Sequence, residues 1–260
     1  MAEPRNASSE GGSRFYTWGN ERFPSVTTVL SVINKPALKK WAARSVAEYA
    51  VKEQDVWTRL SDKAAIDLLK GEPFRYSDER SDLGTAIHEA VEHYIKKQPL
   101  PEYPKDIAPY MKQFEVFLKE WKPRFEMSEA SVYNRRFNYA GTLDMLVWID
   151  SELILLDVKS GSIPNPMFNK ANFWPEAGLQ LNAYARAEFI GLGDNSEHPM
   201  PQVAGAGVLS LRPRHYSIFP CDLNEQAFIA FRAAKALWTW QQELGQQIFG
   251  RPMEPLPPTP

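Results

Sequence analysis

The sequence predicts an α/β fold in which a central mixed β-sheet is flanked by helices, with a helical N-terminal portion. Two observations support this prediction. Residues 141–149 and 152–159 are runs rich in Leu, Ile, Val and Trp, a composition typical of strands, and a further strand is expected before them at 129–137. Segments with helical periodicity precede and follow these runs, and strands return near the C-terminus, an order that suits an α/β sandwich.

The other elements follow from the same patterns. Helices are expected at 26–33, 37–53, 56–70, 82–97, 106–121, 176–190 and 223–248, and further strands at 203–211 and 214–219. With 260 residues, 43% hydrophobic and 24% charged, the chain suits a single domain over 15–250, divided into a helical portion at 15–80 and a core at 81–250. Residues 1–14 are Gly/Ser-rich and residues 251–260 are Pro-rich, so both ends are expected to be disordered tails.

Composition also limits the environment and the partners. No stretch approaches the roughly 20 apolar residues that span a bilayer, and the N-terminus lacks the apolar segment of a secretion signal. We therefore expect a cytoplasmic protein that is not secreted and has no membrane partner. The single cysteine, Cys221, excludes an internal disulfide and a four-cysteine iron–sulfur cluster. A net charge of −2 gives no general attraction to nucleic acid, so such binding needs local basic residues.

Basic residues occur in three places that could supply such contacts. They are Lys35, Lys39, Lys40 and Arg44 near the start, Arg135 and Arg136 before the 141–159 segment, and Lys170 in a long loop at 160–174. The same loop contains Phe168, Phe173 and Trp174, which could stack on unpaired bases or anchor the loop to the body of the protein. Clustered basic side chains more often form a solvated face than a phosphate contact.

Residues 141–149 and 152–159 are interpreted as a β-hairpin, because Asp150 and Ser151 between them suit a two-residue turn. In that register Ile149 faces Glu152, Leu146 faces Leu155, and Asp144 faces Asp157. Directly opposed side chains have Cβ atoms about 5 Å apart. Two carboxylates at that distance repel each other unless a cation lies between them or one holds a proton. Oxygen ligands of this kind suit Mg²⁺ or Mn²⁺.

A lysine completes the cluster. Because side chains alternate along a strand, Lys159 lies on the same face as Asp157, whereas Val158 points to the other face and leaves its backbone carbonyl available at the strand end. The alternative is that both acids are polar strand ends and Lys159 is their salt-bridge partner. A functional site is favoured because the rest of the two strands carries almost no charge, and unpaired buried charge is costly. The apolar positions are Leu143, Met145, Val147, Ile154, Leu156 and Val158 on one face, and Leu146, Trp148, Leu153 and Leu155 on the other.

The expected helix at 82–97 brings a histidine toward this cluster. Its apolar side, which should pack on the sheet, consists of Leu83, Ile87, Ala90, Val91 and Tyr94. His88 and Glu92 lie together at the edge of that side, where His88 could bind a metal and Glu92 could orient it or bind a water molecule. A lone histidine at a helix edge is more often structural. Glu129 could add a further carboxylate, but a solvated strand end is the preferred interpretation.

Four motifs occur in order: Gly84-Thr-Ala-Ile-His88, Gly141-Thr-Leu-Asp144, Asp157-Val-Lys159 and Gln180-Leu-Asn-Ala-Tyr184. This set resembles that of RecB-like nucleases of the PD-(D/E)XK superfamily over roughly residues 80–190. A looser likeness at 23–50 resembles phage and mitochondrial exonuclease relatives. The resemblance implies a restriction-endonuclease-like core and a metal bound by His88, Asp144, Asp157 and the carbonyl of Val158. It also implies that Gln180 and Tyr184 hold the DNA strand and orient Lys159; alone, they would be interpreted as a surface and a core residue.

The expected function is therefore Mg²⁺- or Mn²⁺-dependent hydrolysis of DNA phosphodiester bonds, with Asp144, Asp157 and Lys159 as catalytic residues. An exonuclease acting on DNA ends or single strands in recombination, repair or replication is favoured. The alternatives are a structure-selective endonuclease, or a nucleic-acid-binding module of the same fold that does not cleave. Because the chain has no P-loop motif, a helicase or recombinase would be a separate partner. The chain departs from the iron–sulfur members of the family, since it lacks their cysteines.

Overall fold

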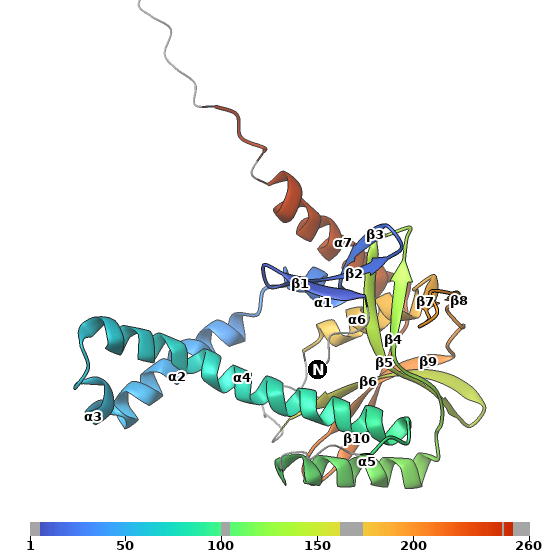
Figure 1. The fold of residues 1–260 in the computed structure, drawn as a ribbon, viewed down its shortest axis with the longest axis horizontal. Coiled ribbons are helices and arrows are strands. Elements are labelled where there is room, and N and C mark those ends of the chain that lie inside the picture. Colours follow the sequence, from blue (N-terminus) through green and yellow to red (C-terminus); the bar gives the residue numbers. More distant parts are fainter. Residues whose placement is uncertain (1–5, 100–104, 162–173, 246, 252–260) are drawn as a thin grey trace, which may run out of the picture.

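The computed structural model describes residues 6–99, 105–161, 174–245 and 247–251. At its centre is a mixed sheet of seven strands, in the order β10-β9-β6-β5-β4-β7-β8 (Figure 1). Strands β6 and β9 are parallel, and the other neighbours are antiparallel. The strands are β4 (Arg124–Asn134), β5 (Tyr139–Ile149), β6 (Glu152–Ser160), β7 (Phe189–Gly191), β8 (Glu197–Pro199), β9 (Gly205–Leu211) and β10 (Tyr216–Cys221). The predicted α/β fold with a mixed sheet is thus confirmed.

Helices cover both faces of this sheet (Figure 1). On one face α4 (Asp62–Ile95) and α5 (Ala108–Trp121) bury residues such as Ile87 and Phe114 against Met145 and Leu156. On the other face α1 (Val26–Leu30), α6 (Glu176–Ala185) and α7 (Glu225–Thr239) form a second core with Leu146. Two apolar cores therefore hold the central strands rigidly between helical layers.

The β5–β6 hairpin has the predicted register, with Leu146 opposite Leu155 and Ile149 opposite Glu152. Asp150 and Ser151 have φ angles of 47° and 70°, as a type I′ turn requires. The predicted assignment of the apolar side chains of β5 and β6 to the two faces of the sheet is also confirmed, except for Leu143. This residue was expected on the face of Met145 but packs in the same core as Leu146. The side-chain alternation is therefore interrupted between these two residues, at the position of Asp144.

The N-terminal segment differs from the prediction, because residues 7–24 form a small antiparallel sheet instead of a tail followed by helix. Its strands are β1 (Ala7–Glu10), β2 (Ser13–Trp18) and β3 (Glu21–Pro24). Gly11 and Gly12, at φ 56° and 78°, make the first turn. Aromatic residues of this sheet, among them Tyr16 and Trp18, pack on Tyr133 of β4 and stabilise it.

Helices α2 (Pro36–Lys52), α3 (Gln54–Trp57) and the first half of α4 form an arm that projects from the body (Figure 1). The two helices expected at 56–70 and 82–97 are replaced by α3 and by the 34-residue α4, which continues through Pro73. A proline inside a helix removes one backbone hydrogen bond. Packing of α2 along α4 offers a tertiary contact that outweighs this local preference.

Other boundaries differ by smaller amounts. Helix α6 ends at Ala185 and not at residue 190, because Phe189–Gly191 form β7; strands β7 and β8 were not among the predicted elements. A short 3₁₀ helix (Lys105–Ile107) precedes α5, and a π-helical turn (Trp240–Leu244) extends α7. In the described ranges, no helix combines the length and the apolar character that crossing a membrane requires.

Candidate metal centre

Three carboxylates lie side by side on neighbouring strands. Backbone pairing of β5 with β6 ends at Met145 and Leu156, so Asp144 and Asp157 come directly after the last pair. The β4–β5 register pairs residues 128 and 145, and then residues 130 and 143, which places Glu129 opposite Asp144. The three acids thus come from β4, β5 and β6, at the point where β5 and β6 separate while β4 and β5 stay paired.

Helix α4 brings His88 to these acids. Its Nδ1 lies 3.6 Å from Oδ2 of Asp144, and ligand atoms of His88, Glu129 and Asp144 all lie within 4.8 Å of one another. The predicted proximity of His88 and Asp144 is therefore present. His88 reaches these acids because Ile87, Ala90 and Val91 on the same helix are buried against the sheet.

Asp157 is almost fully buried, at 1% exposure, and its two oxygens have different neighbours. Lys159 Nζ lies 2.6 Å from Oδ2, and Gln180 Nε2 donates a 3.0 Å hydrogen bond to Oδ1. Burial raises the pKa of Asp157 to about 6, although the Lys159 ammonium opposes this rise and the Asp144 carboxylate adds to it. For Lys159 burial acts downward, but the Asp157 and Asp144 carboxylates outweigh it and leave its pKa above the usual value.

The arrangement of Asp144 departs from the predicted ligand set. Its Oδ2 accepts a 2.6 Å hydrogen bond from the backbone N–H of Val158, which closes the gap between the diverging strands. The Val158 side chain is buried in the opposite core, as predicted. Asp157 faces Lys159 and Gln180 and is not part of the group formed by His88, Glu129 and Asp144 among the described residues.

Glu129 differs from the expected solvated strand end, because it is half-buried within β4. Its φ of 49° is left-handed, a strained conformation for a non-glycine residue within a strand, and such strain concentrates at functional sites. Burial, with the nearby carboxylates of Asp144 and Glu92, raises the pKa of Glu129 to about 8. A cavity of about 510 Å³ opens beside it, along the edge of β4, and leaves room for a ligand.

Gln180 and Tyr184 lie on the same side of α6 and are linked, since Gln180 Nε2 also lies 3.2 Å from the Tyr184 hydroxyl. Burial raises the pKa of Tyr184 well above its usual value. The ring lies directly over Gly141, where a Cβ atom would lie only 2.5 Å from Cε1 of the tyrosine. The glycine of the second motif therefore makes space for the tyrosine of the fourth.

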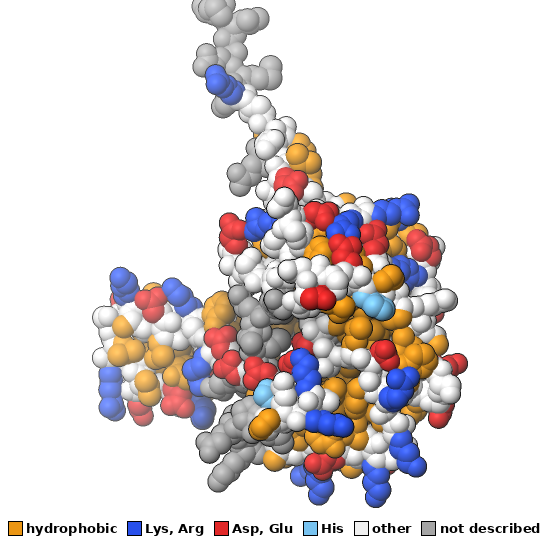
Figure 2. Space-filling model, turned by 45° about the vertical axis from the view of Figure 1, so that its right-hand side comes forward, with side chains coloured by type: hydrophobic (Ala, Val, Ile, Leu, Met, Phe, Trp, Pro, Cys, Tyr) orange, Lys and Arg blue, Asp and Glu red, His pale blue; other side chains and the backbone are white. Residues whose placement is uncertain are grey.

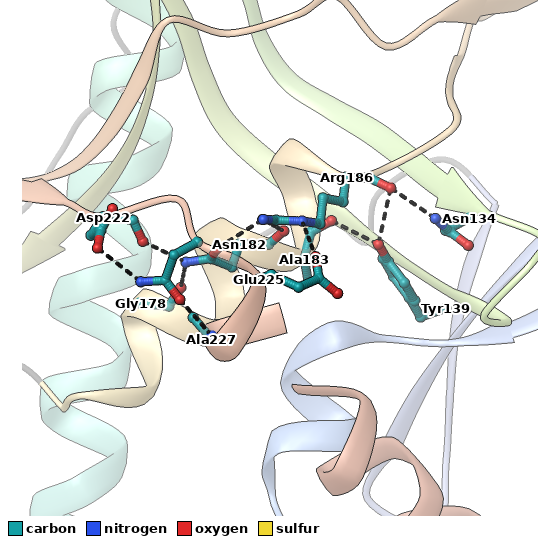
Figure 3. A network of polar contacts seen from close by, with 10 residues as sticks. Asn134, Tyr139, Gly178, Asn182, Ala183, Arg186, Asp222, Glu225 and Ala227 are labelled. Carbon is teal, nitrogen blue, oxygen red and sulfur yellow. Dashed lines mark hydrogen bonds and ion pairs between the residues drawn. The ribbon is translucent and has the colours of Figure 1, made fainter. Parts of the chain in front are cut away.

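A buried polar network fixes α6 in this position (Figure 3). Asn182 has no exposed surface, donates to the carbonyls of Gly178 and Asp222, and accepts a 2.8 Å hydrogen bond from Arg186. On the other side of the helix, the Tyr139 hydroxyl of β5 donates to the Ala183 carbonyl at 2.8 Å. These contacts tie the helix that carries Gln180 to the strand that carries Asp144.

The other predicted site residues are not gathered here. Arg135 donates its guanidinium hydrogens to Glu21 and Glu197 and lies in the β4–β5 turn, where Arg136 is exposed. Glu92 forms an ion pair with Lys96. Lys170, Phe168 and Phe173 lie outside the described residues, and the Lys35 ammonium lies 5.4 Å from the ring centroid of Trp174.

The arm carries several of the other predicted basic residues. Figure 2 shows basic, acidic and hydrophobic side chains interspersed on its visible face. Arg44, for example, forms an ion pair with Glu48. The arm therefore does not present a patch of a single sign on that face.

Comparison with protein-family models and with curated protein sequences gives no match. The solved structure described as the crystal structure of SSO0001 is similar to 66% of this chain, over 71% of its own length, with 12% sequence identity and a TM-score of 0.32. A likeness this weak carries no argument about function, which must be inferred from the site.

Proposed function

We propose that this protein is a divalent-metal-dependent DNA nuclease of the PD-(D/E)XK superfamily. The observation that carries the proposal is the grouping of His88, Glu129 and Asp144 beside the buried Asp157–Lys159 pair, at the point where β5 and β6 separate. The four sequence motifs that resemble the family contribute residues to this one place. A restriction-endonuclease-like core is part of the same proposal.

The donor set fits Mg²⁺ or Mn²⁺. Carboxylate oxygens with one imidazole nitrogen suit these ions. The raised pKa values of Glu129 and Asp157 reflect burial together with neighbouring acids, a cost that a bound cation would offset. His88, Glu129 and Asp144 would hold the ion, with Asp157 and the Val158 carbonyl as further candidates. When bound, a divalent ion lowers the pKa of a coordinated water molecule and polarises the phosphoryl group.

The protein groups would then act by position and charge. The Lys159 ammonium, held by Asp157, would orient the attacking water molecule and stabilise negative charge that develops on the phosphate. Gln180 would keep the Asp157 carboxylate in place, and Tyr184 would support Gln180. The cavity beside Glu129 offers space for the substrate chain next to the acids.

The class of substrate rests on the sequence resemblance. An exonuclease acting on DNA ends or single strands in cytoplasmic repair, recombination or replication is favoured, with 5′-phosphate and 3′-hydroxyl products. A structure-selective endonuclease is the alternative within enzymes. The alternative outside enzymes is a binding module that does not cleave, and the presence of all three acids and the lysine argues against it.

The test uses purified protein with end-labelled linear single-stranded DNA, duplex DNA and a closed single-stranded circle, in Mg²⁺, Mn²⁺ or EDTA. We expect cleavage of linear DNA that requires the metal, whereas the circle stays intact if the protein is an exonuclease. Asp157→Asn and Lys159→Met should each lower the rate by at least about a hundredfold. Glu152→Gln and Lys119→Met remove the same charges from exposed positions and should leave the rate unchanged. Full activity in either site variant would refute the proposed roles.

A further inference from the structure

A second concave surface lies between the β4–β5 turn and the end of α7. Its volume is about 380 Å³, and its lining includes Phe137 from the turn, Phe231, Arg232 and Lys235 from α7, and Trp240 from the π-helical turn. The lining combines aromatic rings with cationic side chains. It contains none of the carboxylates of the metal centre.

The cations of this pocket are not neutralised by ion pairs. The Arg232 guanidinium lies 4.5 Å from the centroid of the Phe137 ring, and Arg136 lies 5.2 Å from the same ring. Lys235 donates a 2.8 Å hydrogen bond to the Thr239 hydroxyl. Among the described residues, Arg232 and Lys235 form no ion pair, although Glu243 acts on Lys235 from further away. The backbone N–H of Arg136 donates a 3.2 Å hydrogen bond to the Glu188 carboxylate. An anionic occupant would therefore meet two cationic side chains, Arg232 and Lys235, that are not held in ion pairs by described residues.

The aromatic residues offer a surface for a planar group. Trp240 is 41% exposed although it lines the pocket, and the neighbouring Leu244 is 52% exposed. Exposing a large apolar ring to water is costly. An exposed ring with cations beside it suits a partner that is both flat and negatively charged. Nucleotide units have this combination, since every base has a π-face and every linkage carries a phosphate.

We propose that this pocket binds a single strand of nucleic acid, with phosphates on Arg232 and Lys235 and a base stacked on Trp240. A single strand fits better than a duplex because a base must leave its neighbours to stack in a concave pocket. The surface is distinct from the metal centre. Tyr139, whose ring packs 4.9 Å from Phe231, is five residues before Asp144 on β5, a separation of about 17 Å along an extended strand.

The test measures binding and not cleavage, so it stands whether or not the protein is a nuclease. Full-length protein in EDTA is titrated with a labelled oligothymidylate of about 15 nucleotides, a length within the usual site sizes, and followed by fluorescence anisotropy at several salt concentrations. The double variant Arg232→Gln/Lys235→Gln should bind about tenfold more weakly and lower the slope of log K against log salt by about 1.4. The control Lys112→Gln/Lys119→Gln removes two exposed lysines from α5, on the other face of the sheet, and should bind like the wild type.

A second variant tests stacking. Trp240→Ala should weaken binding by at least about fivefold without changing the salt slope, and Trp240→Phe should restore most of the affinity. An abasic oligonucleotide of the same length should bind the wild type and Trp240→Ala equally. The inference is overturned if the pocket double variant binds as tightly as the α5 control, if Trp240→Ala retains wild-type affinity, or if polyglutamate of equal charge displaces the oligonucleotide as well as unlabelled oligonucleotide does.

Discussion

Replacing Glu129 by glutamine should stabilise the protein when no metal is bound. Glu129 is half-buried opposite Asp144, and its pKa is raised from 4.5 to about 8, chiefly by burial and then by the Asp144 and Glu92 carboxylates. Because the pKa in the folded state exceeds that in the unfolded state, the folded protein loses stability as pH rises from about 4.5 and the loss is complete near pH 8. The glutamine variant removes this loss.

The size of the effect follows from the same pKa values. Each pH unit between the two pKa values contributes about 1.4 kcal/mol, which gives an upper bound of about 3 kcal/mol at pH 7. Solvent screening of this half-buried group reduces the expected gain to about 1–2 kcal/mol. For a chain of this length that gain corresponds to a Tm increase of about 3–6 °C.

The assay is thermal unfolding in EDTA at pH 4 and pH 7, with Glu152→Gln as a control that removes an exposed carboxylate from the same hairpin. We expect Glu129→Gln to gain stability at pH 7 only and the control to change little at either pH. Adding Mg²⁺ or Mn²⁺ should raise the Tm of the wild type more than that of Glu129→Gln. An equal gain at both pH values, or no gain at pH 7, would show that burial and the neighbouring carboxylates do not destabilise the ionised form of Glu129.

Two further predictions concern the helix that carries Gln180. Gly141→Ala should lower the free energy of unfolding in urea by about 1–3 kcal/mol, because its Cβ would lie 2.5 Å from the buried Tyr184 ring; Gly178→Ala, whose Cβ would meet only a sulfur atom at 3.7 Å, should not destabilise, and an equal loss in both would disprove the clash. Asn182→Ala should cost about 1–3 kcal/mol, since it removes a fully buried side chain that donates to the carbonyls of Gly178 and Asp222 and accepts from Arg186. Unchanged stability of Asn182→Ala would mean that the network does not anchor α6.

The hairpin was predictable because its constraints are local. Two apolar runs separated by Asp150 and Ser151 allow one short turn, and the turn sets the register that places Asp144 beside Asp157. The apolar side of α4 was predictable for the same reason, since Ile87, Ala90 and Val91 recur at the helical period and are buried. The helical period does not say which surface this apolar side packs on; in the structure it packs on the face of the sheet formed by β5 and β6.

The features that the sequence did not predict depend on contacts between distant segments. Residues 7–14 contain glycines and serines that resemble a tail, and they become strands because aromatic residues at 16, 18 and 23 find Tyr133. Helix α4 continues through Pro73 where α2 packs along it. In both places a tertiary contact overrides a local preference.

Glu129 depends on a local register and on a distant contact at once, and this explains how two acids, Glu129 and Asp144, come to lie close together. Glu129 lies opposite Asp144 only once β4 pairs with β5, and its left-handed backbone is an unfavourable conformation that the local sequence does not predict. The favourable free energy of packing in the two apolar cores offsets the cost of this backbone strain and of the repulsion between carboxylates. If those cores were loosened, for example at Met145 or Leu146, the acids would be expected to move apart before the sheet unfolded, so metal affinity should decline at lower urea concentrations than the global unfolding signal.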